Sequence, residues 1–259
     1  MRQMRRMDYN YIHLSINMHF SEYQRIEKWE NRHFWYRAME EQVLELMAKQ
    51  SITAGKILDA GCGTGGFSAK LMEFGEVYAV DINPVAIKHA RKKGLPHLSR
   101  ASIDKLPYPA DFFETVLCLD VLYHEQVKDD LKALQELYRV LKPGGLLILR
   151  LPAFEALRGA HDVVVRTRHR YTVAEVRLKL SKTGFSIKKI SYVNFLLSLL
   201  LLVKRSLERR KNSHYFHSDT APLPPLLNEM FYRILKSENK LLNFLNLPFG
   251  SSLLALAVK

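Results

Sequence analysis

The residues best placed to do chemistry lie in the stretch "KILDAGCGTGGF". Asp59 stands near the end of an apolar run typical of a strand, and a glycine-rich loop follows it before a helical pattern begins. Gly61, Gly63 and Gly66 fit the G-x-G-x-x-G fingerprint of dinucleotide sites, whereas Gly61, Gly63 and Gly65 fit G-x-G-x-G. Glycines in such a loop let the backbone approach a nucleotide closely. The spacing therefore predicts a nucleotide-type cofactor and leaves two classes open.

The charge of Asp59 separates these classes. A dinucleotide would place its pyrophosphate against the loop, and at about 4 Å, with an effective dielectric near 20, the repulsion would be about 4 kcal/mol. S-adenosylmethionine has no phosphate and brings an ammonium and a sulfonium cation, so the same carboxylate attracts it. Asp81, about 20 residues further on, can accept the ribose hydroxyls of either cofactor. We therefore expect S-adenosyl-L-methionine here, with S-adenosyl-L-homocysteine as product, and we disfavour a dinucleotide oxidoreductase.

The elements around this loop alternate between strand and helix. The runs "KILDAG", "EVYAVDI", "TVLCLDVL" and "LLILRLP" are typical of strands, a weaker one lies near "HLSRAS", and helical patterns separate them. A further helix follows the N-cap Thr172, and "SIKKISYV" and "SSLLALAVK" close the strand pattern. This alternation predicts an α/β fold with a parallel, doubly wound sheet. We expect an N-terminal helical cap over residues 1–50, a core over 51–194 completed by 251–259, and a helical insertion over 195–250.

Several motifs together resemble the class I S-adenosylmethionine-dependent methyltransferases, particularly the branch with small-molecule and lipid-type substrates. These motifs are "LDAGCGTGG", "VDINP", "LPYPADFFETVLCLDVLYH" and "LKPGGLLIL". The resemblance runs from about residue 34 to 185 and again over the last strand. It implies a Rossmann-like sheet of seven strands in the order 3-2-1-4-5-7-6, with strand 7 antiparallel. It also implies methyl transfer by in-line displacement, for which the protein mainly aligns the nucleophile.

The resemblance further implies which residues hold the cofactor: Asp59, Gly61, Cys62, Gly63, Thr64, Gly65, Asp81, Ile82, Ser102, Ile103, Asp104, Leu119 and Asp120, together with Tyr36 and Arg37 of the N-terminal segment. In many relatives an Asp that receives the adenine amino group stands at the position of Ser102, and a neutral hydroxyl is a weaker partner. The N-terminal segment resembles a leader helix, in which Trp35 and Tyr36 could close the site and Arg37 could meet the methionine carboxylate. Alternatively, this helix packs by its aromatic residues on the sheet.

Candidate catalytic bases follow the fourth and fifth strands. His124 is one, although it could instead order its loop. In "GAHDVVVRTRHRY", His161 beside Asp162 could form an oriented base, His169 is a further candidate, and the arginines could bind phosphate. The alternative is a solvated basic loop. The spacing of these side chains does not fit a metal site, so we expect no metal.

The composition bounds the partners. The chain has 259 residues, a formal net charge of +13 and 47% hydrophobic residues. The two cysteines, Cys62 and Cys118, favour a reduced, cytoplasmic protein, and the N-terminus has no apolar region typical of a signal peptide. The positive charge suggests an anionic partner. An RNA methyltransferase is therefore an alternative, although nucleic acid is the less favoured partner because no separate RNA-binding module is evident.

The insertion suggests the acceptor. Its run "FLLSLLLLV" is too short to span a bilayer, and it is followed by the basic stretch "KRSLERRK". This composition is typical of an interfacial helix on an anionic membrane. We therefore expect a small-molecule or lipid-linked acceptor, with peripheral membrane binding through residues 195–250. A lid or a dimer surface would bury the same leucines, and a catalytically silent cofactor-binding protein is the remaining alternative. The oligomeric state stays open.

Overall fold

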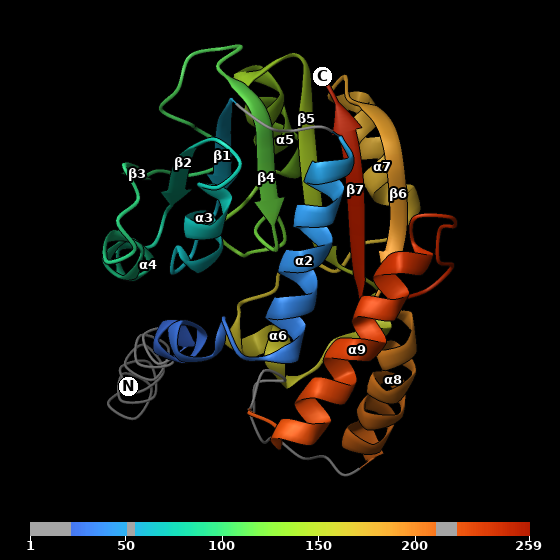
Figure 1. Cartoon of the computed structure of the whole chain (residues 1–259). Helices are drawn as coiled ribbons and strands as arrows, with labels where there is room; N and C mark the ends of the chain where they lie inside the picture. Colours follow the sequence, from blue (N-terminus) through green and yellow to red (C-terminus); the bar gives the residue numbers. More distant parts are fainter. Residues whose placement is uncertain (1–21, 51–54, 211–221) are drawn as a thin grey trace, which may run out of the picture.

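A single mixed sheet of seven strands organises the chain (Figure 1). The computed structural model describes residues 22–50, 55–210 and 222–259. The strand order is β3-β2-β1-β4-β5-β7-β6, and β7 pairs antiparallel with both β5 and β6. The predicted sheet order and the antiparallel last strand are confirmed. The strands are β1 (Lys56–Ala60), β2 (Glu76–Asp81), β3 (His97–Arg100), β4 (Phe113–Leu119), β5 (Leu141–Pro152), β6 (Ser186–Val193) and β7 (Ser252–Val258).

Helices cover both faces of the sheet, which explains why its central strands are continuous apolar runs. Leu134 and Leu137 of α5 and Leu180 of α7 pack in one buried cluster with β4 and β5. Val43 and Met47 of α2 lie in a second cluster against the opposite face. The helices are α2 (Phe34–Lys49), α3 (Gly66–Leu71), α4 (Pro84–Arg91), α5 (Asp130–Val140), α6 (Ala160–Val164), α7 (Val173–Lys182), α8 (Phe195–Arg210) and α9 (Pro225–Leu241), with a 3-10 turn η1 (Glu155–Leu157).

Local signals fix several of these helix ends. Asn83 caps α4 by accepting a hydrogen bond from the Val85 amide, and Pro84 occupies the first turn, where its missing N–H costs nothing. The side chain of Thr172 accepts from the Glu175 amide and caps α7, as its sequence predicts. These contacts are formed by near neighbours, so the sequence alone could place them.

The stretch between β6 and β7 forms α8 and α9, which lie beyond the carboxyl ends of the parallel strands (Figure 1). The Glu238 carboxylate of α9 accepts from the Phe195 amide at 3.0 Å and so caps α8. The Gln42 amide donates to Asn239 at 2.6 Å, which fastens α9 to α2. Because the side chains of Glu238, Gln42 and Asn239 are buried, the two helices belong to the same packed body as the sheet.

The basic stretch that follows the apolar run of this insertion was expected to face an anionic membrane, but one of its arginines is buried. Arg205 is 3% exposed and its Nε donates to the Leu157 carbonyl at 3.2 Å, so this guanidinium does not face solvent. Lys204 lines a cavity described below. The remainder of the basic stretch, residues 208–211, lies outside the described side chains, as do the predictions for residues 1–21.

Candidate functional site

A cavity of about 490 Å³ opens at the carboxyl edge of the sheet. This volume is in the usual range for small-molecule sites. One end is formed by the loop after β1, with Asp59 and Gly63. The other end is apolar and is formed by the insertion, with Leu197, Leu201 and Phe231. The cavity therefore joins the predicted cofactor loop to the predicted insertion.

The loop after β1 is held too tightly for side chains at two of its glycines. Gly61 has φ of +100°, and a Cβ there would lie 2.2 Å from the Val121 side chain. A Cβ on Gly65, whose φ is +78°, would lie 2.9 Å from Ala90. The amides of Gly61 and Cys62 donate to the Val80 carbonyl at 2.8 and 2.9 Å, which anchors the loop on β2. Only glycine fits this cradle, which leaves backbone facing the cavity.

Asp59 is the unbalanced charge of the cavity. It is 4% exposed, and its carboxylate accepts a hydrogen bond from Ser68 Oγ at 2.5 Å. Burial, opposed by this hydrogen bond and reinforced by the charge of Asp81, raises its pKa to about 6. Within the described residues no cation pairs with Asp59. Every other carboxylate that lines the cavity has a cationic partner: Glu22 with Arg25, Glu30 with Lys93, Glu40 with Lys70, Asp120 with Arg150 and Asp162 with Arg170.

Asp81 stands beside the same loop. Its carboxylate accepts from the Gly63 amide at 3.0 Å and from the Asn83 amide at 2.8 Å. Burial, opposed by these backbone bonds, raises its pKa. Burial, reinforced by the charge of Asp81, raises the pKa of Tyr23. Asp59 and the glycine cradle line the cavity and fit the cationic methionine of S-adenosylmethionine, whereas Asp81 is not among the residues that line it, so its contact with the ribose stays a prediction.

The residues expected at the adenine are placed less favourably. Ser102, Ile103 and Asp104 are not among the residues that line the cavity. Ile103 is 4% exposed and packs in the core, and Asp104 Oδ2 lies 3.7 Å from Lys132 Nζ. Ile82 is 37% exposed. Their contact with adenine therefore stays a prediction.

Of the three residues predicted at the site from the N-terminal helix, two line the cavity and one does not. Trp35 and Tyr36 line the cavity, as expected for residues that close it. Arg37 does not, because the helical turn directs it toward α9. There its Nη1 donates to Glu229 Oε2 at 3.1 Å, and its guanidinium lies 3.8 Å from the Tyr232 ring centroid. The geometry gives no support to a contact between Arg37 and the methionine carboxylate.

The candidate catalytic bases also differ in whether they line the cavity. His161 and Asp162 line the cavity, whereas His124 and His169 do not. His169 Nε2 lies 2.8 Å from Glu175 Oε2, and His124 Nδ1 accepts from the Gln126 amide at 3.2 Å, so both order their own loops. Asp162 accepts from the Gly159 amide at 2.8 Å and pairs with Arg170 at 3.3 Å. Of the three predicted histidines only His161 lines the cavity, and His33, which was not singled out from sequence, lines it too.

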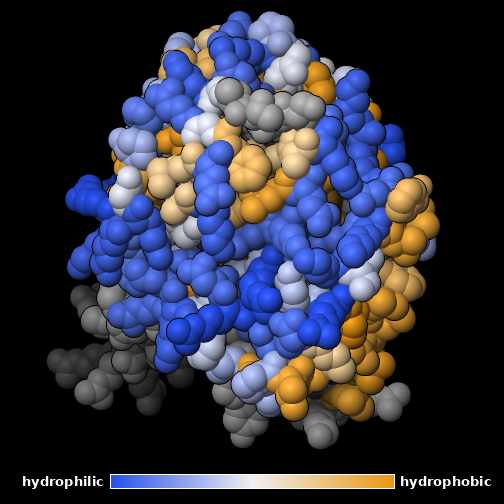
Figure 2. Space-filling view, in the orientation of Figure 1, coloured by the Kyte–Doolittle hydropathy of each residue, from blue (hydrophilic) through white to orange (hydrophobic). Residues whose placement is uncertain are grey.

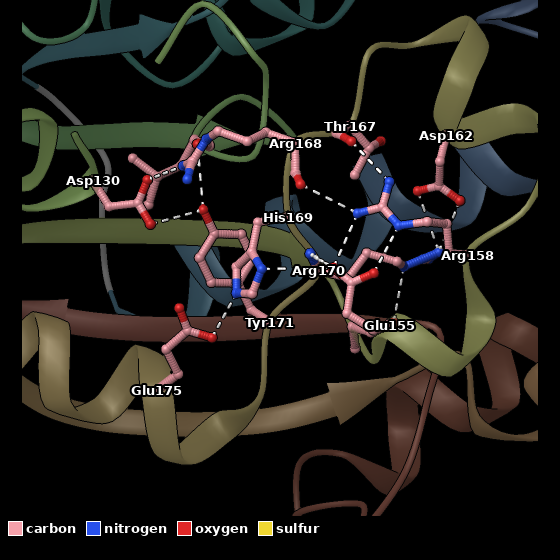
Figure 3. Close-up of polar contacts among 12 residues, drawn as sticks. Asp130, Glu155, Arg158, Asp162, Thr167, Arg168, His169, Arg170, Tyr171 and Glu175 are labelled. Carbon is pink, nitrogen blue, oxygen red and sulfur yellow. Dashed lines mark hydrogen bonds and ion pairs between the residues drawn. The ribbon is translucent and has the colours of Figure 1, made fainter. Parts of the chain in front are cut away.

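The arginines after β5 do not form a phosphate site. Figure 3 shows that Arg158 and Arg170 meet carboxylates or carbonyls of this loop, and that Arg168 meets Asp130 of α5. Arg158 Nε donates to Glu155 at 2.7 Å, and Arg168 pairs with Asp130. Arg166 Nη1, outside this view, donates to Glu125 at 2.6 Å. The arginines of this loop are therefore paired with acceptors of the loop and of neighbouring segments, and the loop shapes one wall of the cavity. Neither the phosphate-binding interpretation nor a freely solvated basic loop describes it.

Several residues at the site were not singled out from sequence, among them His33, Asn194 and Ser252, which line the cavity, and Arg150, which lies beside it. Arg150 of β5 is 1% exposed, and its guanidinium joins Asp120, Ser252 and Trp35. The available signal was a single charge inside the apolar run "LLILRLP". For metals, in the parts of the chain that the structure describes, no three His, Cys, Asp or Glu side chains gather as a candidate site.

Comparisons with known proteins agree with this geometry. Residues 58–149 match the family model described as "Methyltransferase domain". Over 121 residues the chain is 36% identical to the "Ubiquinone/menaquinone biosynthesis C-methyltransferase UbiE" of Vibrio vulnificus, which covers 41% of this chain and 46% of that protein. The chain thus matches about half the length of such relatives.

Solved structures share the fold over most of the chain. The phosphoethanolamine N-methyltransferase 2 of Haemonchus contortus, in complex with S-adenosyl-L-methionine, gives a TM-score of 0.56 at 18% identity, covering 85% of this chain and 52% of that one. The [4+2]-cyclase SpnF gives 0.57 at 19% identity, covering 88% and 83%. An N-methyltransferase and a [4+2]-cyclase carry out different reactions, so the shared fold does not by itself fix the reaction. Residues 58–149 belong to the methyltransferase domain family, and the chain around them has the class I, S-adenosylmethionine-dependent methyltransferase fold.

Proposed function

We propose that this chain transfers a methyl group from S-adenosylmethionine to a small-molecule acceptor with an apolar tail. The observation that carries the proposal is Asp59, a buried carboxylate without a cationic partner in the described residues, at the tip of β1. The donor supplies an activated methyl carbon. Asp59 then attracts the cationic end of the donor, and the glycine cradle admits it.

The residues proposed to hold the donor are those of the loop and its neighbours: Asp59, Gly61, Cys62, Gly63, Thr64, Gly65, Asp81 and Leu119. His161 lines the acceptor part of the cavity and could take a proton if the acceptor must lose one during transfer. Trp35 and Phe34 cover the cavity from α2 and limit the entry of water. The protein's contribution is thus alignment and exclusion of solvent.

The apolar end of the cavity supports a tailed acceptor. Leu197 and Leu201 of α8 line the cavity together with Phe231 and Leu235 of α9. Removing the apolar surface of a tail from water stabilises such a complex by about 0.8 kcal/mol per buried CH₂. The matched relatives are named as C-methyltransferases of ubiquinone and menaquinone biosynthesis, which motivates a quinone-type, lipid-linked acceptor for this chain.

The outer face of α8 supports a place on a membrane surface. Leu196 is 49% exposed, Leu199 46% and Val203 60%, and these positions share one side of the helix. Figure 2 shows apolar side chains gathered at the lower right, where Figure 1 places α8. No helix in the described ranges is long and apolar enough to cross a bilayer. We therefore propose a cytoplasmic chain with peripheral membrane contact through α8, where a tailed acceptor is available.

The experiment is incubation with methyl-labelled S-adenosylmethionine and a bacterial lipid extract, followed by mass spectrometry of labelled products. We expect a labelled, extractable lipid, and a His161→Ala variant that binds the donor normally but labels more slowly if a proton must be removed. A parallel reaction with total RNA tests the alternative acceptor. Donor binding without labelled product in either extract would contradict the proposed transfer.

A further inference from the structure

Arg150 is a buried cation in the otherwise apolar run 146–152 of β5. Its Nη1 donates to Asp120 Oδ2, and its Nη2 donates to Ser252 Oγ at 3.0 Å. The guanidinium carbon lies 4.3 Å from the Trp35 ring centroid, a cation–π distance. Its Nε has no hydrogen-bond partner among the described residues. Burying a guanidinium is costly and seldom stabilises a fold more than apolar packing would, so its presence here points to a role in the site.

The three partners of Arg150 all line the cavity, whereas Arg150 itself does not. They come from three separate elements: Trp35 from the first turn of α2, Asp120 from the tip of β4, and Ser252 from the start of β7. Arg150 therefore lies behind the cavity wall, where its guanidinium contacts all three side chains. A fixed set of three groups at one wall is what a positioned ligand requires.

Asp120 shows how strongly this arrangement is held. Its φ is +56°, a left-handed conformation that is uncommon for residues other than glycine, although aspartate tolerates it better than most. Its amide donates to the Arg150 carbonyl at 2.9 Å, so Arg150 holds both its backbone and its carboxylate. The Arg150 guanidinium donates to Oδ2 of this carboxylate, whose oxygens have further lone pairs that can accept a hydrogen bond from a ligand.

We propose that Arg150 is a positioning residue that holds Trp35, Asp120 and Ser252 as a subsite for a planar, π-bonded acceptor headgroup carrying an O–H or N–H donor. This inference rests on the proposed function and specifies the acceptor of that same site. The indole offers a flat surface for stacking. Asp120 accepts the O–H or N–H of the headgroup, which orients the nucleophile.

The position of this subsite fits both ends of the cavity. Asp120 directly follows Leu119, and both line the cavity together with Asp59 of the donor loop. Ser252 and Asn194 border the insertion, which forms the apolar end. A headgroup on Trp35 would thus face the donor on one side and extend its tail between α8 and α9 on the other.

The sequence permits a direct optical test because it contains two tryptophans, Trp29 and Trp35. A Trp29→Phe variant leaves Trp35 as the sole indole, and this variant is loaded with S-adenosylhomocysteine. Two probes are titrated: a hydroquinone carrying one geranyl chain, and a cyclohexane-1,4-diol with the same chain. We expect the planar probe to quench Trp35 and to bind about tenfold more tightly than the saturated probe, a difference typical of an aromatic pair in a dry site.

Variants of Arg150 test its role. We expect Arg150→Met to lower the affinity for the planar probe at least about tenfold and to shift the emission of Trp35, with binding of S-adenosylmethionine by calorimetry within twofold. Arg139→Met, which removes a paired arginine at the end of α5, should change neither. If Arg150→Met does not fold, Asp120→Asn and Ser252→Ala each remove one contact and should weaken the planar probe selectively.

Equal affinity for the two probes, or planar-probe binding that survives these variants, would overturn the subsite. If the unmodified protein does not bind S-adenosylmethionine, that result would instead contradict the proposed function. The two failures are therefore distinguishable by calorimetry with the donor alone.

Discussion

The substitution Asp59→Asn tests the electrostatic basis of the site, because it removes one charge with almost no change of shape. The asparagine Oδ1 can still accept the hydrogen bond that Ser68 donates in the present structure. The variant should therefore keep the loop geometry and lose only the unpaired negative charge. We expect it to make the ligand-free protein more stable and the donor complex weaker.

The stability change follows from the pKa. Folding raises the pKa of Asp59 from 3.8 to about 6, so at neutral pH its ionised form opposes folding by about 3 kcal/mol. Because folding raises the pKa, the protonated Asp59 side chain contributes its full stability below pH 4. This stability is lost as the pH rises through 6 and the carboxyl ionises. An asparagine has no such dependence. The unfolding free energy of Asp59→Asn should exceed that of the parent by up to about 3 kcal/mol at pH 7.5, and the gap should close near pH 4.

The binding change has the opposite sign. A cation at about 4 Å from Asp59, with an effective dielectric near 20, gains about 4 kcal/mol, which sets an upper limit of about a thousandfold on the loss of affinity. In the parent protein, affinity for S-adenosylmethionine should also fall as the pH drops below 6, because protonation removes the same charge. The variant should lack this dependence.

Calorimetry with the donor and urea unfolding without it, each at pH 7.5 and pH 5, measure both effects. Asp111→Asn is the matched control, since this exposed aspartate pairs with Lys259 far from the donor loop in sequence. The reasoning is refuted if Asp59→Asn destabilises the ligand-free protein at pH 7.5 and binds the donor as tightly as the parent.

Three further outcomes are expected. Gly61→Ala adds a Cβ at φ +100° and 2.2 Å from a valine side chain, so unfolding free energy should drop by about 2 kcal/mol or more and donor binding should be lost; a normal urea midpoint would contradict the tight loop. Replacing Leu199 and Val203 together with Glu should abolish flotation with anionic vesicles at unchanged donor affinity, while Leu178→Glu on α7, equally exposed, should still float. Arg37→Ala should leave donor affinity, measured by calorimetry, within twofold, and a tenfold loss would restore its predicted role.

Much of the donor end could be predicted from the sequence, because it is built from short-range patterns. The strand, the glycine loop and Asp59 occupy consecutive positions, and the alternation of strands and helices determines the sheet that presents them. The caps at Asn83 and Thr172 are formed within three residues of the capping side chain. Local spacing was sufficient for each of these features.

The acceptor end depended on the tertiary structure. Nothing in the spacing of His124, His161 and His169 shows that only His161 reaches the cavity, because that depends on how the loops after β4 and β5 pack. The same holds for Arg150, whose partners Asp120 and Ser252 lie 30 and 102 positions away in sequence. The sequence by itself determined the sheet and the charge that receives the donor. Only the folded structure decided which distant side chains pair with one another, and hence which of them remain available to an acceptor, since a charge is neutralised by its neighbours in space.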